Sequence, residues 1–197
     1  MANLKHVIDK DLDGIDHCNY YWFKDGFSSE EIDKIHKIAD KYNYKAGTTF
    51  DGDTTKIRKS KIKWINHTNE SQWLYEKIFN LTKIANKSCY HFNLHYMEDS
   101  LQYTLYNGGS GDKYDWHLDM GTGNPALRKI SGVLLLSDPD EFEGGELQIF
   151  NSSEPKTVPL VKGSIVFFPS FFLHRVTEVT KGIRKTLVFW IGGDHYR

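Results

Sequence analysis

Two histidines and one aspartate are the residues of this chain whose types and spacing suggest chemistry. His117-Leu118-Asp119 places an imidazole and a carboxylate two positions apart, so on an extended segment both side chains point to one face. His174 lies at the start of a predicted strand. Two imidazoles and one carboxylate make the facial triad that holds non-haem Fe(II) and leaves coordination positions open. The plainer alternatives are a surface pair for the first two residues and a core position for His174.

An arginine near such a metal site would bind an anionic ligand there. Arg184 follows His174 in the next predicted strand, and a buried arginine beside a metal needs an anionic partner. A dicarboxylate such as 2-oxoglutarate offers a carboxylate that accepts a bidentate pair. We expect a three-residue hairpin loop over 180–182, with Gly182 left-handed, because this register puts both residues on one face. Glu178 then lies opposite Arg184, where it would orient the arginine or compete with the ligand. The alternative is an exposed strand arginine.

The elements that must position these residues are helical first and β-rich afterwards. Ser28 and Glu31 fit a capping box at the start of a predicted amphipathic helix over 28–42, and apolar spacing predicts a second helix over 70–86. An edge strand is expected over 57–65, where lysines suit exposure. From Tyr90 the apolar period changes to two, as in a strand. Turn residues separate further predicted strands at 101–106, 130–136, 146–150, 157–161, 164–168, 173–179 and 183–191.

This order of elements predicts the fold class. Many short strands at regular spacing favour an antiparallel sandwich or barrel. The two helices would cover one outer face and complete the core. The chain of 197 residues is expected to form a single domain, mainly β with helical support (α+β).

Composition excludes several classes of protein. Lys and Arg total 25 and Asp and Glu total 26, a net charge of -1, which disfavours a polycationic surface for duplex nucleic acid. No stretch approaches the ~20 apolar residues of a membrane helix, and no signal-peptide pattern follows Met1. The two cysteines, Cys18 and Cys89, are expected to form no disulfide framework and no zinc cluster. We therefore expect a cytoplasmic protein, with the oligomeric state left open.

From Leu101 onward, short segments occur in a characteristic order: Gln102–Tyr106, Lys113–Asp119, Leu134–Leu136, Gly144–Leu147, Phe167–Ser170, Leu173–Val176, Val179–Arg184 and Phe189–Ile191. As an ordered set they resemble the 2-oxoglutarate/iron(II)-dependent dioxygenases, specifically the prolyl 4-hydroxylase-like (PKHD-type) branch. Residues 1–100 match more loosely. The resemblance implies a double-stranded β-helix, or jelly-roll. Residues 1–97 would form the helical support layer and first strands, and residues 98–194 the Fe(II)/2-oxoglutarate dioxygenase core.

The resemblance also implies roles for single residues. His117, Asp119 and His174 match the iron ligands. Arg184 matches the residue that binds the distal carboxylate of 2-oxoglutarate, so these four residues are the candidate catalytic set.

Three aromatic residues complete the candidate site. Tyr106 matches a strand tyrosine that hydrogen-bonds the same cosubstrate, and Tyr114 and Trp190 match residues of the substrate pocket. Packing in an aromatic-rich core is the alternative for all three, because tyrosine and tryptophan are common core anchors.

The implied reaction hydroxylates an unactivated C–H bond and converts 2-oxoglutarate and O2 to succinate and CO2. Fe(II), 2-oxoglutarate and O2 are the implied cofactors and cosubstrates, with ascorbate as a further candidate. The favoured substrate is a prolyl residue in a peptide or protein, and the alternative is a free amino acid or another small molecule. Nucleic-acid dealkylation is disfavoured, because Trp190 stands where that branch carries a second arginine.

Two rival classes remain. A jelly-roll binding module without catalysis would not need the set formed by the triad and Arg184. A cupin-like metal isomerase would use more histidines and would not need Arg184.

Overall fold

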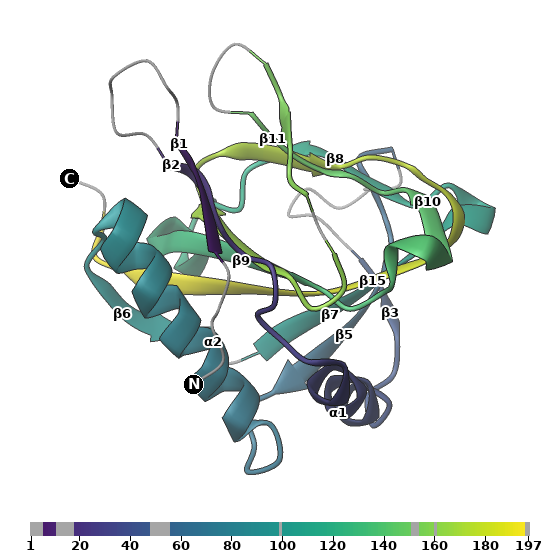
Figure 1. The fold of residues 1–197 in the computed structure, drawn as a ribbon, viewed down its shortest axis with the longest axis horizontal. Coiled ribbons are helices and arrows are strands. Elements are labelled where there is room, and N and C mark those ends of the chain that lie inside the picture. The colour runs from purple at the N-terminus through teal and green to yellow at the C-terminus, as the bar shows by residue number, and fades with distance from the viewer. Residues whose placement is uncertain are drawn as a thin grey trace.

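The computed structural model describes residues 6–10, 18–47, 56–98, 100–150, 154–159 and 161–195. Within these ranges the chain forms two antiparallel sheets and two long helices (Figure 1). The larger sheet follows the order β1 (His6–Lys10), β2 (Cys18–Phe23), β13 (Ile165–Pro169), β9 (Arg128–Leu135), β15 (Val179–Gly193), β7 (Ser100–Asn107), β5 (Lys61–Asn66) and β3 (Lys45–Ala46). The strands β6 (Leu94–Met97) and β10 (Phe142–Gly144) also pair with β15. The smaller sheet follows the order β12 (Lys156–Thr157), β11 (Leu147–Phe150), β14 (Leu173–Val176), β8 (Lys113–His117) and β4 (Arg58–Lys59).

The larger sheet is the middle layer of the molecule. On one face it packs against α1 (Ser29–Ala39) and α2 (Gln72–Ala85), and on the other it faces the smaller sheet (Figure 1). The strand β13 has both of its faces buried. Ile165 and Phe167 belong to the core on the helix side, whereas Val166 and Phe168 belong to the core between the sheets. A strand with both faces buried is expected to be apolar throughout. The antiparallel sandwich with helices on one outer face is therefore confirmed.

Both predicted helices are present and shorter than expected. The capping box of α1 is complete, because the Glu31 amide donates to Ser28 Oγ (3.3 Å) and the Ser28 amide donates to a Glu31 carboxylate oxygen (2.8 Å). α2 continues into a π-helical turn over Asn86–Tyr90, which ends at His91 in a left-handed conformation. The strand expected from Tyr90 is therefore wrong for its first residues, and β6 begins only at Leu94. No helix in the described ranges combines the length and apolar character that crossing a membrane requires.

Two strand predictions were wrong because the chain changes sheets inside them. The segment 57–65 divides at Ser60 into β4 of the smaller sheet and β5 of the larger sheet. The predicted hairpin over 180–182 is absent, because β14 ends in the smaller sheet and β15 runs on through Gly182 in the larger one. Gly182 does have the predicted positive φ of 70°. It is needed because a Cβ there would overlap the Glu141 carbonyl oxygen of the neighbouring chain segment.

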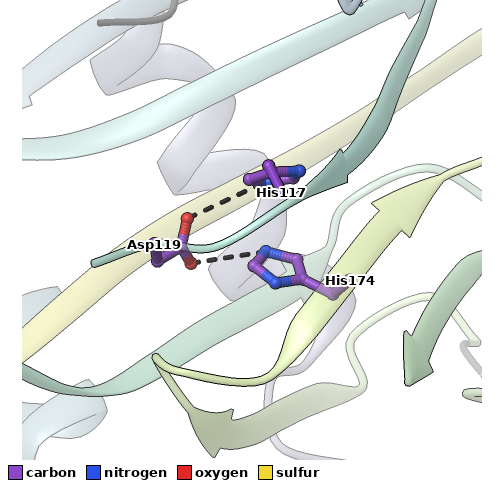
Figure 2. A group of neighbouring side chains, drawn as sticks. All are labelled: His117, Asp119 and His174. Atoms are coloured by element: carbon purple, nitrogen blue, oxygen red, sulfur yellow. Dashed lines mark ion pairs between the residues drawn. The ribbon is translucent and has the colours of Figure 1, made fainter. Parts of the chain in front are cut away.

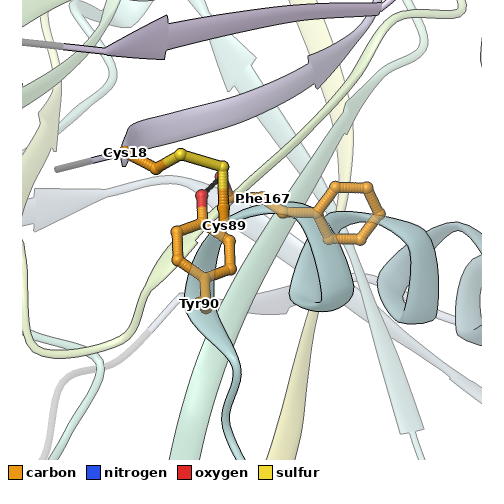
Figure 3. The surroundings of a disulfide bond; sticks show 4 residues. All are labelled: Cys18, Cys89, Tyr90 and Phe167. Carbon is orange, nitrogen blue, oxygen red and sulfur yellow. Dashed lines mark hydrogen bonds between the residues drawn. A yellow bond between two sulfur atoms is a disulfide. The ribbon is translucent and has the colours of Figure 1, made fainter. Parts of the chain in front are cut away.

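A disulfide joins Cys18, at the start of β2, to Cys89 in the π-helical turn (Figure 3). The expectation that these cysteines form no disulfide is therefore corrected. Next to the bond, the Tyr90 hydroxyl donates to the Phe167 carbonyl oxygen of β13 (2.7 Å), so the turn is attached to the sheet twice (Figure 3). Disulfides persist mainly in oxidising surroundings, so the cysteines no longer support a reducing cytoplasm.

The disulfide closes a loop of 71 residues, which predicts a measurable share of the stability. We expect Cys18→Ala/Cys89→Ala to lower the free energy of unfolding by about 2–4 kcal/mol, because the cross-link restricts the unfolded chain. Denaturant unfolding of both proteins without reductant measures the difference. The wild type in reductant is the control and should unfold at the midpoint of the double variant. Equal midpoints for the oxidised wild type and the variant would contradict the prediction.

Candidate active site

The two histidines are cross-strand neighbours in the smaller sheet. His117 is the last residue of β8, and it pairs directly with His174 of β14. Asp119 lies just beyond the end of β8, so the extended segment expected for His117-Leu118-Asp119 is only partly a strand. Figure 2 shows the carboxylate pointing between the two rings. The three ligand atoms lie within 4.8 Å of one another, a spacing that suits one metal ion.

Backbone carbonyl groups set the orientation of both imidazole rings. His117 Nδ1 lies 2.8 Å from the Asp115 carbonyl oxygen, and His174 Nδ1 lies 2.9 Å from the Phe172 carbonyl oxygen. Since a carbonyl only accepts, Nδ1 carries the proton in both rings and Nε2 keeps its lone pair when the ring is neutral. Both Nε2 atoms face Asp119, at 3.7 Å from Oδ1 for His117 and 3.4 Å from Oδ2 for His174 (Figure 2). Such outer hydrogen bonds are typical of metal-ligating histidines.

Burial and neighbouring charges shift the pKa values of the three groups in different directions. Burial, with repulsion from His174, lowers the pKa of His117 to about 3. Burial also opposes a charge on His174, but the neighbouring Asp119 carboxylate raises its pKa above the ordinary value. Burial disfavours the charged form of Asp119, yet attraction and a hydrogen bond from His174 hold its pKa well below the usual range. The cluster therefore presents one carboxylate and two imidazoles, a set of donor groups that a divalent cation can bind.

Arg184 is a buried cation on β15. Its side chain is 1% exposed, and Nη1 and Nη2 make no hydrogen bond to any residue that the structure describes. Burial lowers the pKa of Arg184 to about 10, so the guanidinium stays charged near neutral pH. Glu178, expected opposite it, instead accepts the Gly145 amide through its own carbonyl oxygen (3.0 Å). The two terminal nitrogens are thus available to an anion that enters the site.

All seven predicted site residues line one cavity of about 300 Å³. Its floor follows β15, where Arg184, Thr186, Val188 and Trp190 alternate toward the cavity, as the period of two requires. Arg184 and Trp190 are therefore ~20 Å apart along the strand, at ~3.3 Å per residue. The arginine and the tryptophan mark opposite ends of the cavity.

The arginine end holds Tyr106, which pairs with Arg184 between β7 and β15. The guanidinium carbon lies 5.5 Å from the centre of the Tyr106 ring, and burial raises the pKa of this tyrosine. Its phenol group is therefore a neutral hydrogen-bonding group at neutral pH.

The tryptophan end is aromatic and braced by an ion pair. Trp64 and Trp190 lie 6.3 Å apart between ring centres, and the Arg128 guanidinium carbon lies 3.9 Å from the centre of the Trp190 ring. Arg128 donates to both carboxylate oxygens of Glu98, at 2.6 and 2.9 Å. Bidentate pairs of this kind hold a guanidinium in one orientation, so the aromatic wall has a fixed shape.

Tyr114 and Arg58 lie beside the cluster of His117, Asp119 and His174. The Tyr114 ring stacks on the His117 ring with centres 3.4 Å apart, and the Arg58 guanidinium carbon lies 4.5 Å from the centre of the Tyr114 ring. Four further residues line the cavity and were not predicted as site residues: Arg58, Trp64, Gln102 and Arg128. Arg58 gave no signal, because it stands among lysines in a segment read as an exposed edge.

The buried charge of Arg184 predicts a stability cost in the ligand-free protein. Replacing it by methionine removes a desolvated cation, so Arg184→Met should raise the free energy of unfolding by about 1–3 kcal/mol, the scale of an unsatisfied buried polar group. Denaturant unfolding measures the change. Arg175→Met is the matched control and should give no gain, because Arg175 Nε donates to Gln148 Oε1 (2.8 Å). A loss of stability in Arg184→Met would show that the charge is already compensated.

Residues 101–192 match the family described as the 2OG-Fe(II) oxygenase superfamily. A PKHD-type hydroxylase of Hyphomonas neptunium is 46% identical over 87 residues, which cover 42% of this chain and 39% of that protein. One from Prochlorococcus marinus is 43% identical over 81 residues, which cover 41% of this chain and 37% of that protein. The matched segments thus span about two fifths of these curated relatives.

Solved structures share the fold at low identity. A Trichoplax adhaerens prolyl hydroxylase, solved with a hypoxia inducible factor peptide fragment, has a TM-score of 0.73 at 17% identity, covering 89% of this chain and 84% of that one. A Pseudomonas putida prolyl-4-hydroxylase has a TM-score of 0.67 at 19% identity, covering 89% and 93%. The two-layered sandwich is therefore the prolyl hydroxylase jelly-roll. Residues 101–192, which include the His117, Asp119 and His174 cluster and Arg184, are thus similar in sequence to the 2OG-Fe(II) oxygenase superfamily and to proteins named PKHD-type hydroxylases.

Proposed function

We propose that this protein is an Fe(II)- and 2-oxoglutarate-dependent dioxygenase that hydroxylates an unactivated C–H bond. One observation carries the proposal: the three-residue cluster and an arginine with unpaired terminal nitrogens line the same cavity. The cluster suits a cation, and the arginine suits the far carboxylate of a dicarboxylate. A binding module would not require both features, and a cupin-like isomerase would not require the arginine.

The ligand set fits Fe(II). His117, Asp119 and His174 would hold the ion through two imidazole nitrogens and one carboxylate oxygen, the facial combination that leaves positions open. When bound, the iron supplies the oxidative chemistry that couples O2 and 2-oxoglutarate to hydroxylation, with succinate and CO2 as products. The protein supplies neutral imidazoles of fixed tautomer through the Asp115 and Phe172 carbonyl oxygens.

The arginine end of the cavity fits 2-oxoglutarate. Arg184 would bind the distal carboxylate, and the Tyr106 hydroxyl would donate to the same molecule. Val133, Leu147 and Val176 are apolar residues that line the same cavity. Apolar walls exclude water, and this strengthens the attraction between the guanidinium and a carboxylate. A ligand of this kind would also compensate the buried charge that the ligand-free protein carries.

The tryptophan end fits the substrate. We propose a prolyl residue of a peptide or protein, because Trp64 and Trp190 offer aromatic faces and Leu118 is an exposed apolar side chain on the rim. The names of the structurally similar prolyl hydroxylases, one of them solved with a peptide, agree with this substrate class. A free amino acid is the second candidate, since the cavity also fits a small molecule.

An anaerobic titration tests the metal and cosubstrate assignments. Fe(II) and 2-oxoglutarate added to the protein should produce the visible charge-transfer band of a chelated keto acid. His174→Ala should remove the band and the turnover of 2-oxoglutarate, because two ligands remain. His95→Ala is the matched control and should keep both, since His95 is an exposed histidine paired with Asp194. A folded wild type without the band would favour the binding-module alternative.

Turnover with defined substrates tests the prolyl assignment. Proline-containing peptides should release succinate and gain one oxygen in mass, whereas free proline should not. Trp190→Ala should lower kcat/KM for the peptide at least tenfold, about 1.4 kcal/mol, because it removes the aromatic wall. The KM for 2-oxoglutarate should stay unchanged, and Trp190→Phe should retain most activity. Equal rates with free amino acids would instead support the small-molecule alternative.

A further inference from the structure

Asp119 lies beyond the end of β8, so its position depends on contacts with other segments. β8 ends at His117, so no strand pairing holds the aspartate. Its amide donates to the Ser170 carbonyl oxygen (3.1 Å), and its carbonyl oxygen accepts from Arg128 Nη1 (3.1 Å). These contacts place the backbone, but the terminal torsion of an aspartate is broad. The orientation of the carboxylate depends on its side-chain contacts, of which His117 Nε2 and His174 Nε2 lie at 3.7 and 3.4 Å.

Ser131 makes the shortest of these side-chain contacts. It lies on β9, is fully buried, and its Oγ is 2.6 Å from Asp119 Oδ2. A serine hydroxyl carries one hydrogen, and the charged carboxylate can only accept, so Ser131 donates to Asp119. Ser131 Oγ also lies 3.0 Å from Ser170 Oγ, and its remaining capacity there is to accept. The direction of the chain is therefore Ser170 to Ser131 to Asp119.

We propose that Ser131 is a positioning residue of the metal site. Its hydroxyl holds Asp119 Oδ2, and the carboxylate then presents Oδ1 on the side of His117, whose Nε2 is 3.7 Å away. A buried hydroxyl costs free energy unless it is hydrogen-bonded, and a bond to a carboxylate is one of the stronger compensations. This inference rests on the proposed Fe(II) site and adds a residue outside the triad that sets its affinity.

A purely structural hydrogen bond is the competing explanation, and the chain offers a matched control for it. Ser137 is also buried, and its hydroxyl donates to the Ile183 carbonyl oxygen (3.1 Å) and accepts from the Lys185 amide (2.8 Å). Like Ser131, it is not among the residues that line the cavity. Ser137→Ala and Ser131→Ala both remove a buried hydroxyl, but only Ser131→Ala changes the surroundings of Asp119.

The experiment measures Fe(II) affinity directly, by anaerobic calorimetry on the metal-free full chain, without any turnover. Ser131→Ala should raise the Kd tenfold to a hundredfold, the range for losing an outer hydrogen bond to a metal ligand. Ser137→Ala should leave the Kd unchanged. Ser131→Thr keeps the hydroxyl and should restore the affinity to within about threefold of wild type. Ser131→Cys, a weaker donor of similar size, should give an intermediate Kd if Ser131→Ala or Ser131→Thr does not fold.

The outcomes separate this inference from the proposed function. A folded wild type that binds no Fe(II) would overturn the proposed function. A wild type that binds Fe(II), with Ser131→Ala or Ser131→Cys binding equally or more tightly, would overturn the positioning role alone. An equal loss of affinity in Ser137→Ala would also overturn it, since the effect would then follow from any lost buried hydroxyl.

Discussion

The antiparallel pairing of β15 with β7 on one side and β9 on the other is the interaction on which the site depends. It fixes which side chains of β15 face the cavity, and a slip of one residue would turn Arg184 and Trp190 toward the helices. It also brings Tyr106 beside Arg184 and Ser131 opposite Trp190. Both ends of the cavity and the support of Asp119 therefore follow from one strand register.

Two buried charges of the cavity, on Asp119 and Arg184, differ in how far neighbouring groups compensate them. Asp119 is satisfied by two imidazoles and a serine hydroxyl, whereas the terminal nitrogens of Arg184 have no partner in the described part of the chain. A buried cation of this kind costs stability in the ligand-free protein, and the carboxylate that we propose as its ligand would recover this cost. A lower folding stability without ligand, together with a higher affinity for the ligand, is common at functional sites.

The cavity is not built by the matched segment alone. Residues 101–192 supply the cluster and Arg184, but Arg58 of β4 and Trp64 of β5 come from earlier in the chain. β4 closes the edge of the smaller sheet beside β8, and β5 extends the larger sheet beside β7. Trp64 at the proposed substrate end and Arg58 beside Tyr114 thus both come from outside the matched segment.

Features that are local, or that follow from residue type, could be predicted from the amino-acid sequence. The capping box predicted the start of α1, the period of two predicted most strands, and two histidines with one aspartate predicted the triad. The contacts between distant segments could not be predicted in this way. The disulfide joins residues 71 positions apart, β14 and β15 enter different sheets where a hairpin was predicted, and Arg58 is buried among exposed lysines. Hydrophobic periodicity reports which face of a segment is buried. It carries no information on which strand becomes the neighbour, and that pairing brings Ser131 to Asp119 and leaves Arg184 buried without a partner.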